Sequence, residues 1–96
     1  MKLIIAIVHD EDVNRILDEF SDNNLRITKM STTGGFLKLG NTTLLSGVEN
    51  HELHTAIQII ANNSQRKQQV ENNSSSKLTI GRATIFVVDV ERFEKY

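Results

Sequence analysis

The sequence predicts an α+β domain in which two helices cover one face of a four-stranded antiparallel sheet. Four stretches show the apolar runs or alternation of strands, and two have apolar residues at helical spacing. Their order along the chain is βαββαβ, with no internal repeat evident in the sequence. This order is typical of the ferredoxin-like fold. Because the chain has 96 residues, we expect residues 1–96 to form a single domain.

The first half of the chain predicts a strand, a helix and a second strand. Residues 3–8 form a continuous apolar run rich in β-branched side chains, which favours a central strand. Asp10 is a suitable helix cap. The apolar residues after it follow i, i+3, i+4, i+7 spacing, at Val13, Ile16, Leu17 and Phe20. Residues 21–24 end this helix in a turn, and residues 25–32 predict the second strand.

The second half predicts a strand, a helix and a final strand. Residues 41–48 alternate as a third strand, and Asn50 is a candidate cap for the second helix. We expect this helix to continue to about Gln69. Residues 78–90 predict the fourth strand, and residues 91–96 form a short tail, about one helical turn long.

Two segments predict loops. Residues 34–40 form a glycine-containing loop between the second and third strands. Residues 65–77 are rich in Gln, Asn, Ser, Lys and Arg, and this composition predicts a flexible loop.

The apolar pattern of the strands predicts an assembly. The first strand is apolar at every position from residue 3 to 8, and the fourth is apolar on both faces. Two helices cover only one face of a sheet, so the other face needs a different cover. We therefore expect a closed homo-oligomer. The alternative is a monomer with an apolar open face.

Composition and charge exclude several classes of protein. A net charge of -1 lacks the basic surplus needed to bind DNA or RNA by charge. The absence of cysteine excludes disulfides, thiol catalysis and cysteine-ligated zinc. No apolar stretch reaches the roughly 18 residues that span a membrane. The apolar run at residues 3–8 is too short for a signal peptide, so we expect a cytoplasmic protein.

Nothing in the sequence predicts an enzyme or a metal site. His51 and His54 are three residues apart on the second helix but lack a third ligand, so we interpret them as solvated. The acids that follow His9 at residues 10–12 are explained by the start of a helix. No nucleophile elbow, P-loop or dinucleotide fingerprint is present, and no paired carboxylates are evident. We expect no cofactor.

Residues 24–47 combine the groups that a nucleotide pocket needs. Arg26 and Thr28 are two apart on one strand face and suit a phosphate. Phe36 offers a ring for stacking, and Asn41 an amide for reading a base edge. Gly34 and Gly35 allow backbone amides to approach a ligand, and Gly47 leaves space on the third strand. A Gly-Gly turn between strands is nevertheless usually just a hairpin.

These residues also carry a resemblance to a known family. The runs at residues 24–29, 32–37, 40–43 and 47–48, together with 1–10, 81–87 and 92–96, are similar to the PII-like cyclic di-AMP receptors. The resemblance implies a homotrimer that binds cyclic di-AMP in clefts between subunits and signals to other proteins. It implies that one subunit contributes Asn24, Arg26, Thr28, Gly35, Phe36, Leu37, Asn41 and Gly47. It implies that the neighbouring subunit adds Phe86 and the C-terminal segment with Lys95.

The sequence departs from the family pattern in two places. Residues 65–77 are much shorter than the family's loop over the ligand, and Lys95 stands where Gln or a similar group is usual. Lys donates but cannot accept a hydrogen bond, which changes the readout of adenine. A second hypothesis is therefore a short-loop paralogue that has lost cyclic di-AMP and acts as an adaptor for another ligand or a partner protein.

Overall fold

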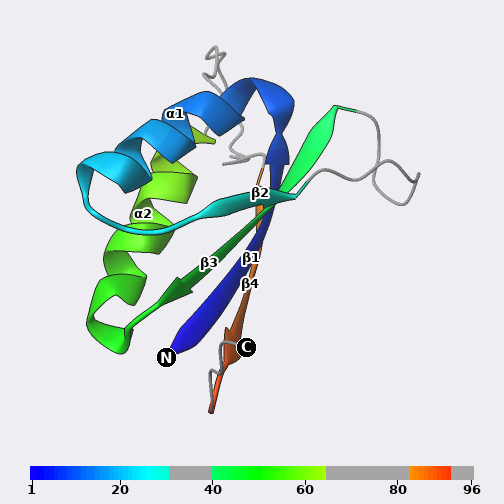
Figure 1. Ribbon diagram of the computed structural model, residues 1–96. Coiled ribbons are helices and arrows are strands. Elements are labelled where there is room, and N and C mark those ends of the chain that lie inside the picture. Colours follow the sequence, from blue (N-terminus) through cyan, green and yellow to red (C-terminus); the bar gives the residue numbers. More distant parts are fainter. Residues whose placement is uncertain (31–39, 65–82, 92–96) are drawn as a thin grey trace, which may run out of the picture.

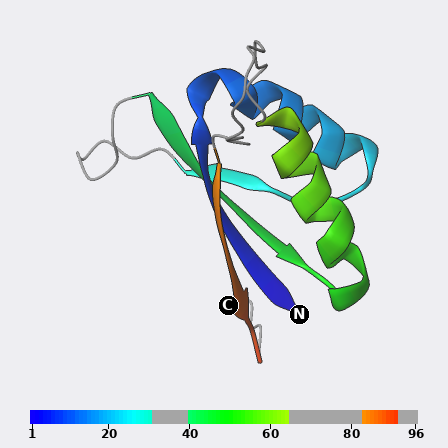
Figure 2. The ribbon, with the colours of Figure 1, turned by 180° about the vertical axis from the view of Figure 1, so that it is seen from behind.

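The computed structural model describes residues 1–30, 40–64 and 83–91, and it confirms the predicted fold class. The elements are β1 (Lys2–His9), α1 (Asp10–Asp22), β2 (Thr28–Met30), β3 (Asn41–Val48), the 3-10 helix η1 (Asn50–Glu52), α2 (Leu53–Asn63) and β4 (Thr84–Asp89). The four strands form one antiparallel sheet in the order β2-β3-β1-β4. Figure 1 and the reverse view in Figure 2 show α1 and α2 on the same face of this sheet.

The central position of β1 confirms the interpretation of its apolar run. The strand pairs with β3 along one edge and with β4 along the other. Alternate residues Ile4, Ala6 and Val8 face the helices and are buried. The residues between them lie on the opposite face, which we call the open face.

The core lies between the sheet and the two helices. Strand β3 adds Leu44 and Val48 to the residues of β1, and the helices contribute the spaced apolar side chains that the sequence predicts. The buried helical residues are Val13, Ile16, Phe20, Ala56, Ile59 and Ile60. Burial of each large apolar side chain contributes about 1.5–3 kcal/mol. This packing fixes which face of every strand is open.

Strand β2 is shorter than predicted. It begins at Thr28 rather than at residue 25, because the preceding residues are held differently. Leu25 is 9% exposed and packs in the core, and its N–H donates to the carbonyl of Phe20 rather than to β3. The predicted continuation of this strand to residue 32 passes beyond residue 30 and lies outside the described residues.

Strand β4 is also shorter than predicted at its C-terminal end. It ends at Asp89 instead of residue 90, although the Val90 N–H donates to the Met1 carbonyl at 3.0 Å. Predicted strand residues 78–82 and most of the predicted tail, residues 92–96, lie outside the described ranges.

Both predicted helix caps are wrong. Asp10 is the first residue of α1, and His9 takes the cap position. The Asp10 carboxylate instead accepts a hydrogen bond from Thr42 Oγ1 at 2.5 Å. Asn50 is the first residue of η1, whose cap is Glu49, because Glu49 and Glu52 form a reciprocal capping box. Glu52 takes the cap position of α2 itself.

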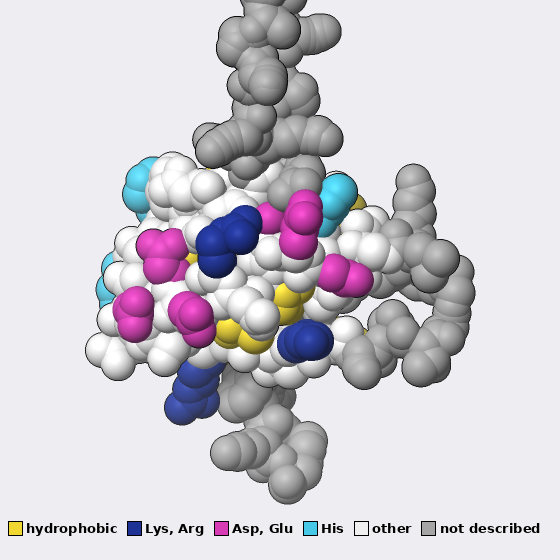
Figure 3. Space-filling view, turned by 90° about the horizontal axis from the view of Figure 1, so that it is seen from above, with side chains coloured by type: hydrophobic (Ala, Val, Ile, Leu, Met, Phe, Trp, Pro, Cys, Tyr) yellow, Lys and Arg dark blue, Asp and Glu magenta, His cyan; other side chains and the backbone are white. Residues whose placement is uncertain are grey.

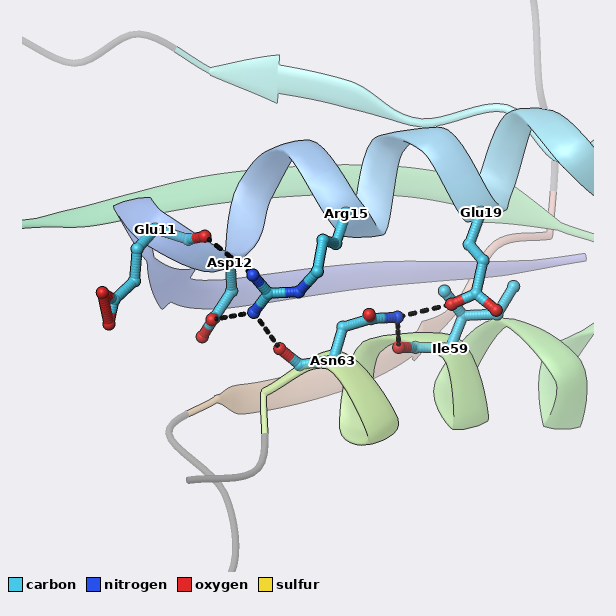
Figure 4. Close-up of polar contacts among 6 residues, drawn as sticks. All are labelled: Glu11, Asp12, Arg15, Glu19, Ile59 and Asn63. Carbon is cyan, nitrogen blue, oxygen red and sulfur yellow. Dashed lines mark hydrogen bonds and ion pairs between the residues drawn. The ribbon is translucent and has the colours of Figure 1, made fainter. Parts of the chain in front are cut away.

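Helix α2 ends at Asn63, not near Gln69 as predicted, and a polar cluster joins this end to α1 (Figure 4). The Arg15 guanidinium donates to the carboxylate of Asp12 at 2.6 Å and to the carbonyl of Asn63 at 3.2 Å. The Asn63 side chain in turn donates to Glu19 Oε1 at 2.6 Å. A cation at the C-terminal end of a helix is favourable, so Arg15 stabilises both α2 and the helix pair.

The charges of the described residues are strongly unequal. Ten of the twelve acidic residues lie in the described ranges, but only four of the eleven basic ones do. Figure 3 shows magenta acidic side chains spread over the face seen from above, with few basic ones among them. Neither helix in the described part of the chain is long and apolar enough to cross a membrane.

Candidate functional site

The segment that carries Asn24, Arg26 and Thr28 leaves α1 through a left-handed turn. Asn24 has φ +58, and its N–H donates to the Ser21 carbonyl at 3.0 Å. The next N–H, from Leu25, donates to the Phe20 carbonyl at 2.8 Å. This pair of bonds is a Schellman motif, with Asn24 at the position that requires a positive φ. Asn is one of the few residues that adopt this conformation readily, so Asn24 shapes the segment whatever its side chain binds.

Arg26 is exposed, but its backbone is fixed to β3. The Ser46 hydroxyl donates to the Arg26 carbonyl at 2.6 Å, and Ser46 itself is 3% exposed. A shallow hollow of about 490 Å³ opens beside this segment, lined by Leu17, Ser21, Leu25, Arg26, Ile27 and Thr28. The segment therefore presents a cation at the rim of a largely apolar hollow, next to the edge of the sheet.

The strand registers place Thr28, Asn41, Gly47 and Phe86 on the open face. One row across the sheet joins Thr28, Leu45, Ile5 and Phe86. The next joins Gly47, Leu3 and Val88, while Asn41 lies opposite His9 at the end of β1. These rows are largely apolar, and Phe86 is 52% exposed. These four predicted ligand residues therefore share the face that the helices leave uncovered.

A single chain does not bring Phe86 close to Thr28. These residues lie on the two opposite edge strands of the sheet, β4 and β2. Three strand spacings separate them, which is about 14 Å. Phe86 and Thr28 therefore lie at opposite edges of the open face of one chain.

Within a single chain, the fold leaves room for a side chain at position 47, so it does not require glycine there. Among the described residues, an added Cβ would meet only the flexible end of Met1, at 3.4 Å. Gly40 differs, because its φ of +89 is one that other residues rarely adopt. Gly40 ends the predicted glycine-containing loop, and its carbonyl accepts a hydrogen bond from the Asp10 N–H at 2.8 Å.

Several predicted site residues lie outside the described residues: Gly35, Phe36, Leu37 and Lys95. The same holds for residues 34–39 of the glycine-containing loop and for the whole of loop 65–77. Of the histidines, His51 and His54 are exposed, and no group of metal-binding side chains forms within residues 1–30, 40–64 and 83–91.

Sequence reasoning missed Ser46, which touches the candidate site through the Arg26 backbone. The signal was present in the third strand. Leu44, Ser46 and Val48 alternate toward the core, so a serine stands at a position where an apolar residue is the norm. A buried hydroxyl needs a hydrogen-bond partner. The sequence alone did not show that this partner lies twenty residues earlier.

The antiparallel sheet and the two helices on one face define a ferredoxin-like fold, and the strand order is consistent with a PII-like protein. The sequence model of the family described as "Cyclic-di-AMP receptor" matches residues 1–96. The chain therefore belongs to the cyclic-di-AMP receptor family, as its resemblance indicated.

A solved structure supports the same fold. It is that of a functionally unknown protein from Pediococcus pentosaceus ATCC 25745, which is 42% identical in sequence. The match covers 99% of this chain and 96% of that chain, with a TM-score of 0.75.

Proposed function

We propose that this protein is a signal-transduction receptor that binds cyclic di-AMP in clefts between the subunits of a cytoplasmic homotrimer. The observation that carries the proposal is the family match over the whole chain, joined to the exposed Arg26 beside Thr28 at the edge of the sheet. Arg26 and Thr28 contact phosphate in this proposal, and Asn41 and Phe36 contact the base. Gly35, Leu37 and Gly47 shape the pocket, and the neighbouring subunit adds Lys95. The family is one of receptors, and we assign the chain no catalytic role.

The separation of Phe86 from Thr28 supports a site between subunits. A ligand held by Arg26 and Thr28 at one edge reaches a Phe86 ring only if that ring comes from a neighbour. The open face supplies the surface for such an assembly. Its central rows are apolar, through Leu3, Ile5, Leu45 and Val88, and packing them against other copies removes this area from water.

The adaptor hypothesis rests on the short segment at residues 65–77. A shorter loop over the ligand excludes less water and makes fewer contacts, which weakens binding. The family model nevertheless matches the whole chain, this segment included. We therefore favour the receptor.

Calorimetric titration with cyclic di-AMP, with ATP as the control nucleotide, tests the proposal. We expect saturable binding of one cyclic di-AMP per subunit and no comparable heat with ATP. Absence of heat together with absence of a thermal shift at high ligand concentration would contradict the receptor and leave the adaptor.

A further inference from the structure

We propose that Ser46 is a positioning residue of the nucleotide site, because its hydroxyl holds the carbonyl of Arg26 and so restrains the direction of the Arg26 side chain. This inference rests on the proposed function. Ser46 lies on β3 between two core positions, Leu44 and Val48, which are 1% and 2% exposed. An apolar residue at this place would pack against the same core without a polar group to satisfy. The hydroxyl is instead used in one bond, to the carbonyl of Arg26 at 2.6 Å.

This bond stands where the backbone ladder is missing. The pairing of β2 with β3 covers only Thr28, Lys29 and Met30, opposite Leu45, Leu44 and Thr43. Arg26 precedes the ladder, so no strand pairing fixes its peptide group. The Ser46 side chain replaces the missing ladder bond and ties the segment before β2 to the sheet.

The bond from Ser46 holds the backbone on the C-terminal side of Arg26. On the N-terminal side, Leu25 is anchored by its buried side chain and by its N–H bond to Phe20. On the C-terminal side, the Arg26 carbonyl is anchored by Ser46. The backbone is therefore held one residue before Arg26, at the Leu25 N–H, and again at the Arg26 carbonyl, which restrains the Cα–Cβ direction of Arg26. Displacements of about 1 Å in such a segment are enough to weaken a site that depends on charge geometry.

The position of Ser46 in β3 also links it to Gly47. Successive residues of a strand face opposite sides, so Ser46 faces the core while Gly47 lies on the open face. The buried Ser46 hydroxyl therefore bonds the backbone of one proposed ligand residue, Arg26, and Ser46 is adjacent in the chain to a second, Gly47.

The test compares Ser46→Ala with a matched control, Ile4→Val. Ile4 is the register partner of Ser46 on β1 and is 1% exposed, so both changes remove a small part of the same core layer. We expect Ser46→Ala to bind cyclic di-AMP about three- to ten-fold more weakly, as loss of one hydrogen bond allows. Ile4→Val should bind within two-fold of the natural chain at a similar loss of thermal stability. Ser46→Thr, which keeps the hydroxyl, should restore most of the affinity.

A double variant separates positioning from general damage. If Ser46 acts through Arg26, adding Ser46→Ala to Arg26→Ala should weaken binding by less than two-fold further. The proposal is overturned if the two losses multiply, or if Ser46→Ala binds as tightly as Ile4→Val.

Hydrogen–deuterium exchange without ligand distinguishes a failure of this inference from a failure of the proposed function. We expect Ser46→Ala, but not Ile4→Val, to speed amide exchange over residues 25–30. If the natural chain does not bind cyclic di-AMP, the proposed function fails, and the exchange rates still decide whether Ser46 orders the Arg26 segment. Equal exchange in the two variants contradicts that ordering.

Discussion

Asn24 shows how one residue serves both the fold and the candidate site. Its φ of +58 closes the Schellman motif at the end of α1, and it stands two residues before Arg26. The resemblance to the family assigns it to the ligand, whereas the structure gives it a conformational task. These two roles are separable, because glycine adopts a positive φ without a side chain and alanine has neither the preference nor the amide.

Substitutions of Asn24 should divide these roles. We expect Asn24→Ala to lower the free energy of unfolding by about 1 kcal/mol, since alanine is strained at a positive φ. Asn24→Gly should stay within a few tenths of a kcal/mol of the natural chain. Chemical denaturation measures both. If Asn24 also contacts the ligand, Asn24→Gly will bind cyclic di-AMP more weakly despite its stability, and unchanged affinity would remove Asn24 from the site.

Arg26 is the residue on which the phosphate contact depends. We expect Arg26→Ala to weaken cyclic di-AMP binding by about 1.5–3 kcal/mol, because a charge-assisted bond is lost. Lys29→Ala is a matched control, since Lys29 is an exposed cation of β2 whose register partner is the buried Leu44 on the helix side. Calorimetry of the two variants decides the matter: equal affinities would exclude Arg26 from the pocket.

At the scale of elements, the pairing of β4 with β1 matters for the proposed interface between copies, because β4 carries Phe86 and Val88 on the open face. An ion pair between Lys2 and Asp89 joins the two strands where their residues are register partners. The hydrogen bond and the charge of Lys2 hold the pKa of the Asp89 carboxyl below its ordinary value of 3.8. Asp89 is well exposed, so the contribution of the pair is small and screened by solvent.

The pH dependence of this contribution has a definite sign. A lowered pKa in the folded state means that the stabilisation is complete above pH 3.8 and is lost as the pH falls through the folded-state pKa. We expect Asp89→Asn to melt at a slightly lower temperature than the natural chain at pH 7, with the difference fading below about pH 4. Glu91→Gln, an exposed acid two residues later, should show no such difference. Thermal melts at a series of pH values test both variants, and a gap that widens in acid would contradict the assignment.

At the scale of the whole molecule, the apolar open face is not covered by any described element of the same chain. The helices cover one side of the sheet only, and Val88 and Phe86 are 45% and 52% exposed on the other side. Neighbouring side chains of β4 point to opposite faces of the sheet. Val87, which is 42% exposed on the helix side, can therefore be compared directly with Val88 on the open face.

A charge on the open face should break the proposed trimer. We expect Val88→Glu to reduce the particle from three times 10.8 kDa to 10.8 kDa in light scattering, because a carboxylate is costly to bury in an apolar interface. Val87→Glu should keep the natural mass. Circular dichroism of both variants tests whether they are folded. A natural chain that already scatters as a monomer would contradict the trimer itself.

The sequence predicted the elements more accurately than their ends or their side-chain bonds. The periods of the apolar residues place β1, β3 and both helices, and β3 has the predicted bounds. The start of β2 was wrong because Leu25 looks like a strand residue, while its N–H completes the end of α1. The cap at Glu49 was missed because glutamate is a weaker cap signal than the asparagine beside it, and the reciprocal bond with Glu52 decides the position.

For the candidate site, the sequence could identify which residues suit a ligand, but not at which edge of the sheet each of them lies. The resemblance implied that Thr28, Asn41 and Gly47 line one side of the ligand and that a neighbour adds Phe86. The register shows that all four positions lie on the open face. The distance between Thr28 on β2 and Phe86 on β4 follows from the order of the strands in the sheet. That order depends on pairing between segments remote in sequence. Ser46 was missed for a similar reason, because its partner is remote in sequence.

The pairing of β1 with β4 has a consequence for how the protein is made. Strand β1 ends at residue 9 and β4 begins at residue 84, so β1 leaves the ribosome well before the strand with which it pairs. Synthesis at about 5–20 residues per second separates their appearance by about 4–15 s. During this interval one edge of β1, which is apolar from residue 3 to residue 8, is unpaired. Contacts between residues so remote in sequence also form slowly. The β4 strand of another copy meets the same edge with the same sequence, so crowded expression favours exchange of β4 between nascent chains.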